Sequence, residues 1–209
     1  MISRRRFLVA LGGATTLSQT AFAADSALGP APPLPTFGIV FHRPTNGDEA
    51  HAFLHETSRA MTLARSIYAP VGFDLAVDVV LPLDESHHRI ENVATRDTLA
   101  PLVRGQRINV FLVEALRDAE VKDLYRLGVT WDSRVAPLRR YIILTRGARE
   151  SSLAHELGHF FGIPEHSATK NNLMSYDRDD ALVFLDDAQN TRIRAGAARL
   201  LGSHAQAAI

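Results

Sequence analysis

One short stretch, HELGHFFGIPEH at residues 155–166, constrains this chain more than any other part of the sequence. Two histidines stand four residues apart in it, and a glutamate follows the first. On an α-helix, residues four apart lie one above the other on the same face, so His155 and His159 can bind a single ion. The apolar side chains gather on the opposite side of that helix: Leu153, Leu157, Phe160 and Phe161. The sequence therefore predicts a helix that is buried on one side and carries a metal site on the other.

The residue types at this site favour catalytic zinc. The chain contains no cysteine, so histidine, aspartate and glutamate are its only strong metal ligands. Glu156 lies about 100° around the helix from His155, which places it near the ion but not among its ligands. A zinc ion with an open coordination position lowers the pKa of bound water to about 7, so a neighbouring carboxylate can take its proton. We predict one Zn²⁺ and assign Glu156 as the general base.

The third ligand is less clearly marked. No glutamate occurs after Glu165, which leaves Glu165, His166, the aspartates from 177 onward and His204 as candidates. Gly162 can end the helix in a left-handed conformation, and His166 follows that turn, where the chain can fold back under the ion. Imidazole is also a good zinc ligand. We therefore favour His166 and keep Glu165 as the alternative.

The N-terminal sequence predicts export. Residues 1–23 contain an arginine cluster, a short apolar run and a small-residue pattern that ends at Ala23, as a signal peptide does. The arginines also resemble the twin-arginine export consensus of bacteria. The apolar run is too short to span a bilayer as a helix. We expect cleavage after residue 23, a proline-rich linker at 24–36, no stable membrane insertion afterwards, and a periplasmic or secreted protein.

Apolar patterns along residues 37–209 predict one α/β domain. We expect strands at 37–43, 73–83, 108–116, 127–131 and 139–145. Helices are expected at 48–68, at 151–162 and at 186–201. In the second strand, alternation should place four apolar residues on one face: Phe73, Leu75, Val77 and Val79. The polar segment 84–105 is expected to be irregular.

Composition and charge exclude some partners. The chain has 209 residues, 46% of them apolar and 22% charged, an ordinary globular balance. Its formal charge is zero, and removal of residues 1–23, with three arginines and no acid, leaves −3. No basic tract is interleaved with aromatic residues, so we expect no nucleic-acid partner. His51 and His55 also stand four apart, but no glutamate follows the first, and we expect a solvated helix face there.

The sequence resembles the metzincin clan of zinc peptidases. The resemblance rests on HELGHFFGIPEH and on NLMSY at 172–176, which looks like the methionine turn of that clan. Met174 matches the methionine beneath the zinc site. Tyr176 matches a tyrosine that in some metzincins approaches the metal and steadies the transition state. The extra residue before His166 departs from the best-known clan pattern.

The resemblance implies a fold and a function. It implies an upper subdomain at about 37–162, with a twisted mixed sheet and two helices, above a small irregular lower subdomain at about 163–209 that ends in a helix. The order of strand runs before the motif is similar to the pappalysin-like branch. The implied activity is that of a monomeric zinc endopeptidase on peptide or protein substrates, with Tyr176 donating a hydrogen bond to the oxyanion and no other cofactor. The acids at 177–180 would favour basic side chains after the cleaved bond.

Two other functions remain open at this point. One is a zinc-dependent amide hydrolase that acts on the cell envelope, because the motif defines the chemistry but not the substrate. The other is a non-catalytic metal-binding protein on the same fold. Glu156 argues against the second, because a site that only binds a metal has no need of a base.

Overall fold

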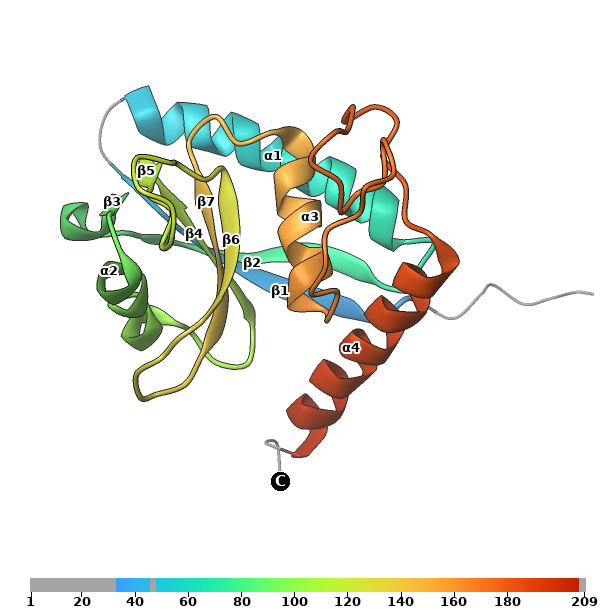
Figure 1. Cartoon of the computed structure of the whole chain (residues 1–209). Coiled ribbons are helices and arrows are strands. Elements are labelled where there is room, and N and C mark those ends of the chain that lie inside the picture. The colour runs from blue at the N-terminus through green and yellow to red at the C-terminus, as the bar shows by residue number, and fades with distance from the viewer. Residues whose placement is uncertain (1–32, 46–47, 207–209) are drawn as a thin grey trace, which may run out of the picture. The chain divides into compact units, whose positions relative to one another are not determined.

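A twisted sheet of five strands forms the centre of the fold (Figure 1). The computed structural model describes residues 33–45 and 48–206, so the predicted signal peptide and most of the predicted linker lie outside the described residues. The strands are β1 (Thr36–Arg43), β2 (Asp74–Pro82), β4 (Ile108–Val113), β6 (Gly128–Asp132) and β7 (Arg140–Thr145). They lie in the order β2-β1-β4-β7-β6, with β6 antiparallel to β7 and the other neighbours parallel. This mixed, mostly parallel sheet confirms the predicted α/β fold class.

The central strands are apolar because both of their faces are covered. All residues of β4 are buried, and so are all residues of β7 except the first. A parallel strand covered on both sides reads as a nearly continuous apolar run rather than as an alternation. The strands expected at 37–43, 127–131 and 139–145 form with small shifts of their ends. The single strand expected at 108–116 divides into β4 and β5 (Ala115–Leu116), and β5 belongs to a separate two-stranded sheet.

The second strand, β2, departs from the expected alternation. Leu75 is buried, but Val77 and Val79 are 48% and 39% exposed. A bulge interrupts the pairing of β2 with β1, and β2 is an edge strand. The bulge changes which side chains share a face, and the edge position leaves the second half of the strand without cover. Val77 keeps the face of Leu75 without being buried, and the prediction that four apolar residues share one face is wrong for Val79, which follows the bulge.

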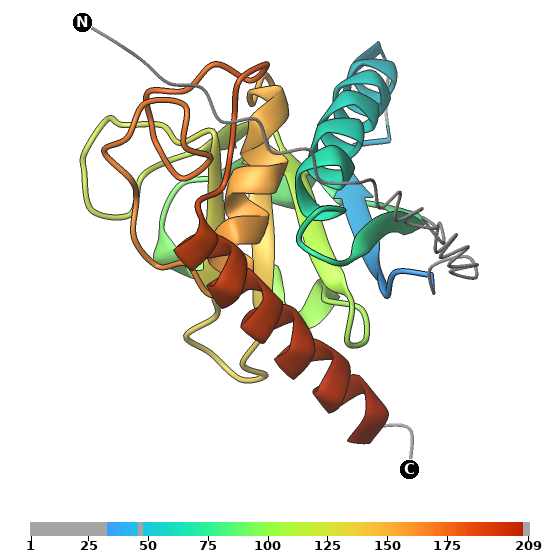
Figure 2. The same cartoon turned by 90° about the vertical axis from the view of Figure 1, so that its right-hand side faces the viewer.

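Two helices cover one face of the sheet. They are α1 (Asp48–Tyr68), at the predicted bounds, and α3 (Glu150–Phe160), which carries the motif. Figure 2 shows them side by side. The core on this face includes Leu153, Leu157 and Phe161, as the helix pattern predicts. The Tyr68 hydroxyl donates a 2.6 Å hydrogen bond to the backbone oxygen of Ala154, which ties α1 to α3.

The segment 84–105 covers the other face and is more regular than expected. It contains η1 (Glu85–His87), β3 (Arg89–Ile90), α2 (Val93–Asp97) and η2 (Ala100–Leu102), and β3 pairs with β5 (Ala115–Leu116). Asn92 and Thr95 form a capping box that begins α2. Ile90 and Leu99 pack in a second core against β4 and β7. The polar composition conceals this structure, because only a few side chains of the segment face inward.

The last helix, α4 (Asp187–Gln206), packs against the end of α3. Figure 2 shows α4 running obliquely past α3. At Gly196, an added Cβ would lie 1.8 Å from the backbone oxygen of Phe161, so only glycine allows this close approach. The residues from 34 onward form one compact unit, and none of the helices described in it is long and apolar enough to cross a membrane. The proposed division near Gly162 into two subdomains stays a prediction.

Candidate metal centre

Three histidines meet at the exposed end of the motif. His155 and His159 lie one turn apart on α3, and His166 comes from the chain that folds back after the helix. The ring centroid of His166 lies 5.3 Å from that of His155 and 4.9 Å from that of His159. One ring nitrogen of each histidine lies within 4.8 Å of the other two. Among the described residues, this is the only group of three or more ligand-type side chains that could share a metal ion.

Backbone hydrogen bonds orient two of the rings. His155 Nδ1 lies 2.8 Å from the backbone oxygen of Leu173, and His159 Nδ1 lies 2.6 Å from that of Ile163. A carbonyl can only accept, so each Nδ1 carries the proton and each Nε2 has a free lone pair. Such a hydrogen bond on the far ring nitrogen is the usual support of a metal-binding histidine.

The spacing of two of the nitrogens matches that in a tetrahedral zinc site. His159 Nε2 and His166 Nε2 are 3.3 Å apart. Two lone pairs at that distance need a proton or a cation between them. Zinc–nitrogen bonds of about 2.0–2.1 Å in tetrahedral geometry place two nitrogens about 3.3 Å apart. The donor set present in this structure is therefore suited to Zn²⁺.

The electrostatics of the site also favour metal binding. Burial lowers the pKa of His155 to about 3 and lowers the pKa values of His159 and His166. At neutral pH all three imidazoles are therefore neutral, which is the form that binds a metal.

The turn after α3 accommodates the extra residue of the motif. Gly162 has φ +110°, a conformation that favours glycine, and its N–H donates a 3.0 Å hydrogen bond to the backbone oxygen of His159. The chain then turns back so that His166 joins the cluster. Glu165, the alternative ligand, is exposed and forms a 2.8 Å ion pair with Arg192 of α4. The structure thus groups His166, and not Glu165, with the two motif histidines.

Met174 lies beneath the motif helix. It is fully buried, and a Cβ added at Gly158 would come within 2.6 Å of its sulfur. The Met174 N–H donates a 2.9 Å hydrogen bond to Asn172 Oδ1, and the Asn172 side chain exchanges hydrogen bonds of 2.8 and 3.0 Å with Gln189 of α4. Sequence reasoning missed the Asn172–Gln189 pair, because no spacing rule connects two polar residues in a turn and a distant helix.

Glu156 is buried between α3 and β6. Thr130 Oγ1 lies 3.0 Å from Glu156 Oε2 and 2.7 Å from the Glu156 backbone oxygen. Burial raises the pKa of Glu156 to about 7, although the Thr130 hydrogen bonds oppose that shift. A Cβ added at Gly128 would lie 3.0 Å from Glu156 Oε1, so glycine leaves room for the carboxylate. The sequence marked 127–131 as a strand but gave no sign that Gly128 and Thr130 contact Glu156.

Tyr176 stands beside the third histidine. Its ring stacks on that of His166, with centroids 4.3 Å apart and planes at 24°. Its hydroxyl lies 3.4 Å from His166 Nδ1 and 3.5 Å from a guanidinium nitrogen of Arg126. The side chain is 61% exposed and lines the same cleft as the histidines. The second histidine pair of the sequence, His51 and His55, forms no such site among the described residues. His55 is exposed and belongs to no group of metal-ligand side chains, and the side chain of His51 lies outside the described residues.

The histidines open into a cleft of about 760 Å³. One wall is β6, the last strand in the order of the sheet, together with the loop at 118–127. The opposite wall is one side of α3, the turn after it and the chain around Tyr176. The three histidines and Glu156 all line this cleft.

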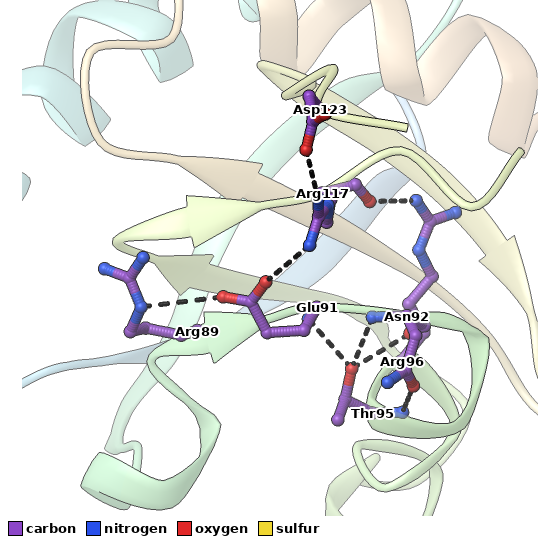
Figure 3. A network of polar contacts seen from close by, with 7 residues as sticks. All are labelled: Arg89, Glu91, Asn92, Thr95, Arg96, Arg117 and Asp123. Carbon is purple, nitrogen blue, oxygen red and sulfur yellow. Dashed lines mark hydrogen bonds and ion pairs between the residues drawn. The ribbon is translucent and has the colours of Figure 1, made fainter. Parts of the chain in front are cut away.

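A polar network holds the start of the loop at 118–127, called the loop wall below, against the neighbouring segments (Figure 3). Arg117 forms ion pairs with Asp123 at 2.5 Å and with Glu91 at 3.8 Å, and its backbone oxygen accepts a 2.7 Å hydrogen bond from Arg96. Within the loop, Asp118 accepts hydrogen bonds from two backbone N–H groups and pairs with Arg126. The wall is therefore shaped before any ligand arrives.

Comparison with known proteins identifies the fold. No protein-family model matches the sequence, and neither does any curated protein. Among solved structures, metalloproteinase-II from Bacteroides fragilis matches at 16% identity and TM-score 0.50, over 80% of this chain and 55% of that one. Archaemetzincin from Methanopyrus kandleri matches at 14% identity and TM-score 0.52, over 78% of this chain and 96% of that one. Mirolysin in complex with compound 9 matches at 10% identity and TM-score 0.56, over 78% of this chain and 92% of that one. The chain thus spans little more than half of metalloproteinase-II, and its fold is that of metzincin-type metalloproteases, as the resemblance predicted.

Proposed function

We propose that this chain is a zinc-dependent endopeptidase in which His155, His159 and His166 hold the metal and Glu156 is the general base. One observation carries the proposal. Three neutral imidazoles converge, two of them oriented by backbone carbonyls, in a cleft that also contains a buried carboxylate. A site that only stores a metal does not need that carboxylate.

The chain's own groups supply the proton transfers. When bound, zinc supplies a Lewis acid that activates water and polarises a carbonyl. The Glu156 carboxylate accepts a proton from the attacking water and passes it to the leaving amine. A pKa of about 7 suits both roles, since the group must take up and release a proton near neutral pH. The Tyr176 hydroxyl and the Arg126 guanidinium lie on the same side of the cleft and can donate to the developing oxyanion.

The edge strand favours a peptide as the substrate. In the described structure β6 pairs with β7 on one side, and its other edge lines the cleft. Such an edge presents unpaired backbone N–H and C=O groups, which an extended peptide can pair with as an added strand. A small envelope amide would use little of this wall. We further propose that the protein acts after export, in the periplasm or outside the cell, and as a monomer.

Metal analysis together with a protease assay tests the proposal. The chain from residue 24 onward should contain zinc and cleave a peptide library, lose activity to a chelator and regain it with added zinc. Glu156→Gln should keep zinc and lose about 10²–10⁴-fold in rate. Glu150→Gln is the matched control, because this carboxylate stands on the same helix but pairs with Arg59 at 3.0 Å outside the cleft. Unchanged cleavage by Glu156→Gln would contradict the assignment, and zinc binding without cleavage of any peptide would favour the amide hydrolase or the non-catalytic protein.

A further inference from the structure

The walls of the cleft carry more positive than negative side chains. Four acids line it: Asp118, Glu120, Asp132 and Glu156. Six arginines line it: Arg96, Arg126, Arg134, Arg140, Arg149 and Arg178. This excess is local, because the chain as a whole has equal numbers of basic and acidic residues.

Only two of these arginines have an acidic partner in the described structure. Arg126 pairs with Asp118, and Arg140 pairs with Asp132 at 2.7 Å. The other four make no ion pair with any described carboxylate. Two of them, Arg96 and Arg134, lie over the ring of Trp131, at 4.8 and 5.2 Å from its centroid, so an aromatic face accounts for their position. Arg149 and Arg178 have no such explanation.

Arg178 is held rigidly beside the catalytic groups. Its Nε donates a 2.8 Å hydrogen bond to Ser151 Oγ, and its Nη1 donates a 2.5 Å bond to the backbone oxygen of Ser175. No hydrogen bond from Nη2 is found within the described residues. Arg178 lines the same cleft as His155 and Glu156, so its guanidinium lies beside the reacting groups. An arginine positioned in this way presents a fixed donor to the cleft.

Arg149 adds a second positive charge next to the first. One of its guanidinium nitrogens donates a 3.0 Å hydrogen bond to the backbone oxygen of Arg178. Burial lowers the pKa of Arg178, and the charge of Arg149 lowers it further. Asp180 and Glu156 oppose this shift, but neither forms an ion pair with Arg178 in the described structure. Two close cations without an acidic partner repel each other, and an anion bound between them relieves that repulsion.

We propose that Arg178 and Arg149 bind an acidic side chain of the substrate next to the cleaved bond, so that the protein selects peptides with aspartate or glutamate there. This inference rests on the proposed peptidase function and names its substrate class. It reverses the expectation that the acids at 177–180 would favour basic side chains, because Arg178, and none of the acids in that segment, lines the cleft.

Matched peptides test the selectivity with two readouts. The probes are labelled eight-residue alanine-based peptides with one central Glu, Gln or Lys. Cleavage is measured with the zinc-loaded chain, and binding with Glu156→Gln by fluorescence anisotropy. We expect the Glu peptide to exceed the Gln peptide by about tenfold in kcat/KM and in affinity, with the Lys peptide weakest. The preference should weaken as salt is added.

Substitutions locate the preference. Arg178→Gln should bring the Glu-to-Gln ratio close to one. Arg149→Glu should shift the preference toward the Lys peptide, and because Arg149 is exposed this variant keeps the fold. Arg107→Gln is the control, since Arg107 pairs with Asp78 at 3.2 Å on β2, the opposite edge of the sheet, and should leave the ratio unchanged.

The outcomes separate this inference from the proposed function. Equal cleavage and binding of the Glu and Gln peptides would overturn the inference and leave the peptidase intact. A Glu preference that survives both arginine substitutions would also overturn it. A Glu preference in binding, removed by Arg178→Gln but without cleavage of any peptide, would support the inference and remove the proposed function.

Discussion

At the scale of single residues, the site depends on two close approaches that only glycine permits. Met174 reaches the underside of α3 because Gly158 has no Cβ, and Glu156 fits against β6 because Gly128 has none. Gly158 lies in the motif and Gly128 lies opposite it, so their lack of a side chain makes room for Met174 and Glu156 next to the three histidines. Their contribution is steric and can be measured apart from any catalysis.

Gly158→Ala should destabilise the fold. The added Cβ would come within 2.6 Å of the Met174 sulfur, and overpacking of a filled core costs about 1–3 kcal/mol. Gly202→Ala is the matched helical control, because a Cβ there meets nothing within 4 Å and should stabilise the protein by about 0.5–1 kcal/mol. Urea unfolding of both variants gives the comparison, and an unchanged midpoint for Gly158→Ala would show that Met174 does not pack as described.

Thr130→Val should lower kcat and leave zinc bound. The valine keeps the shape of the side chain but removes the hydroxyl that lies 3.0 Å from Glu156 Oε2. A hydrogen bond to a charged group contributes about 1.5–3 kcal/mol, which corresponds to a loss of roughly tenfold or more. Thr191→Val on α4, whose hydroxyl bonds only to its own helix, is the control and should keep full kcat. An equal loss in the two variants would mean that Thr130 has no special relation to Glu156.

The sequence alone predicts the residues of the motif, but it does not predict the residues that orient them. His155, Glu156 and His159 follow from the helical period, because their relation is local. Thr130 lies 26 residues from Glu156 along the chain, and Arg178 lies 27 residues from Ser151. Contacts over such separations depend on how strands and turns pack, and no local pattern encodes them. The same limit kept Glu165 open as an alternative to His166, which the sequence favours.

At the scale of elements, the long periodic segments were predictable and the short ones were not. The helix 48–68 was predicted at its observed bounds, and the apolar runs gave the central strands. The elements of segment 84–105 could not be predicted, because β3 has two residues and α2 only five, too few for a periodic pattern. Pairing with β5 holds β3, and a capping box begins α2. The loop wall at 118–127 was also not predictable, since polar contacts rather than a sequence period hold it in place.

The loop wall should loosen in acid. Hydrogen bonds from the backbone of Val121 and Glu120, and then from Arg126, lower the pKa of Asp118 to about 2, below its ordinary value of 3.8. A carboxylate with a lowered folded-state pKa contributes stability that is full above the unfolded value and is lost as pH falls toward the folded value. We therefore expect stability to decline between about pH 4 and pH 2 in part through Asp118.

Asp118→Asn isolates this contribution. Thermal unfolding of both proteins is measured across that pH range in the presence of a chelator, so that metal loss does not enter the comparison. The variant should be less stable at pH 6 and should show a flatter decline between pH 4 and pH 2. Parallel curves for the two proteins would exclude Asp118 as the source.

At the scale of the whole molecule, the proposed metal site joins parts of the chain that meet only in the folded state. His155 and His159 come from α3, His166 from the turn after it, and the Asn172–Gln189 pair connects the methionine turn to α4. A ligand that binds only the folded chain stabilises it, by about 4 kcal/mol at a thousand times its Kd. Zinc should therefore raise the unfolding temperature of the unaltered protein, and removal of a ligand should abolish that rise.

The zinc content of His166→Ala and Glu165→Ala, measured side by side on purified protein, tests the central claim most directly. The structure groups His166 with the two motif histidines and pairs Glu165 with Arg192. We predict that Glu165→Ala retains about one zinc ion per chain and that His166→Ala loses it. Full zinc in His166→Ala, with loss only in Glu165→Ala, would contradict the account.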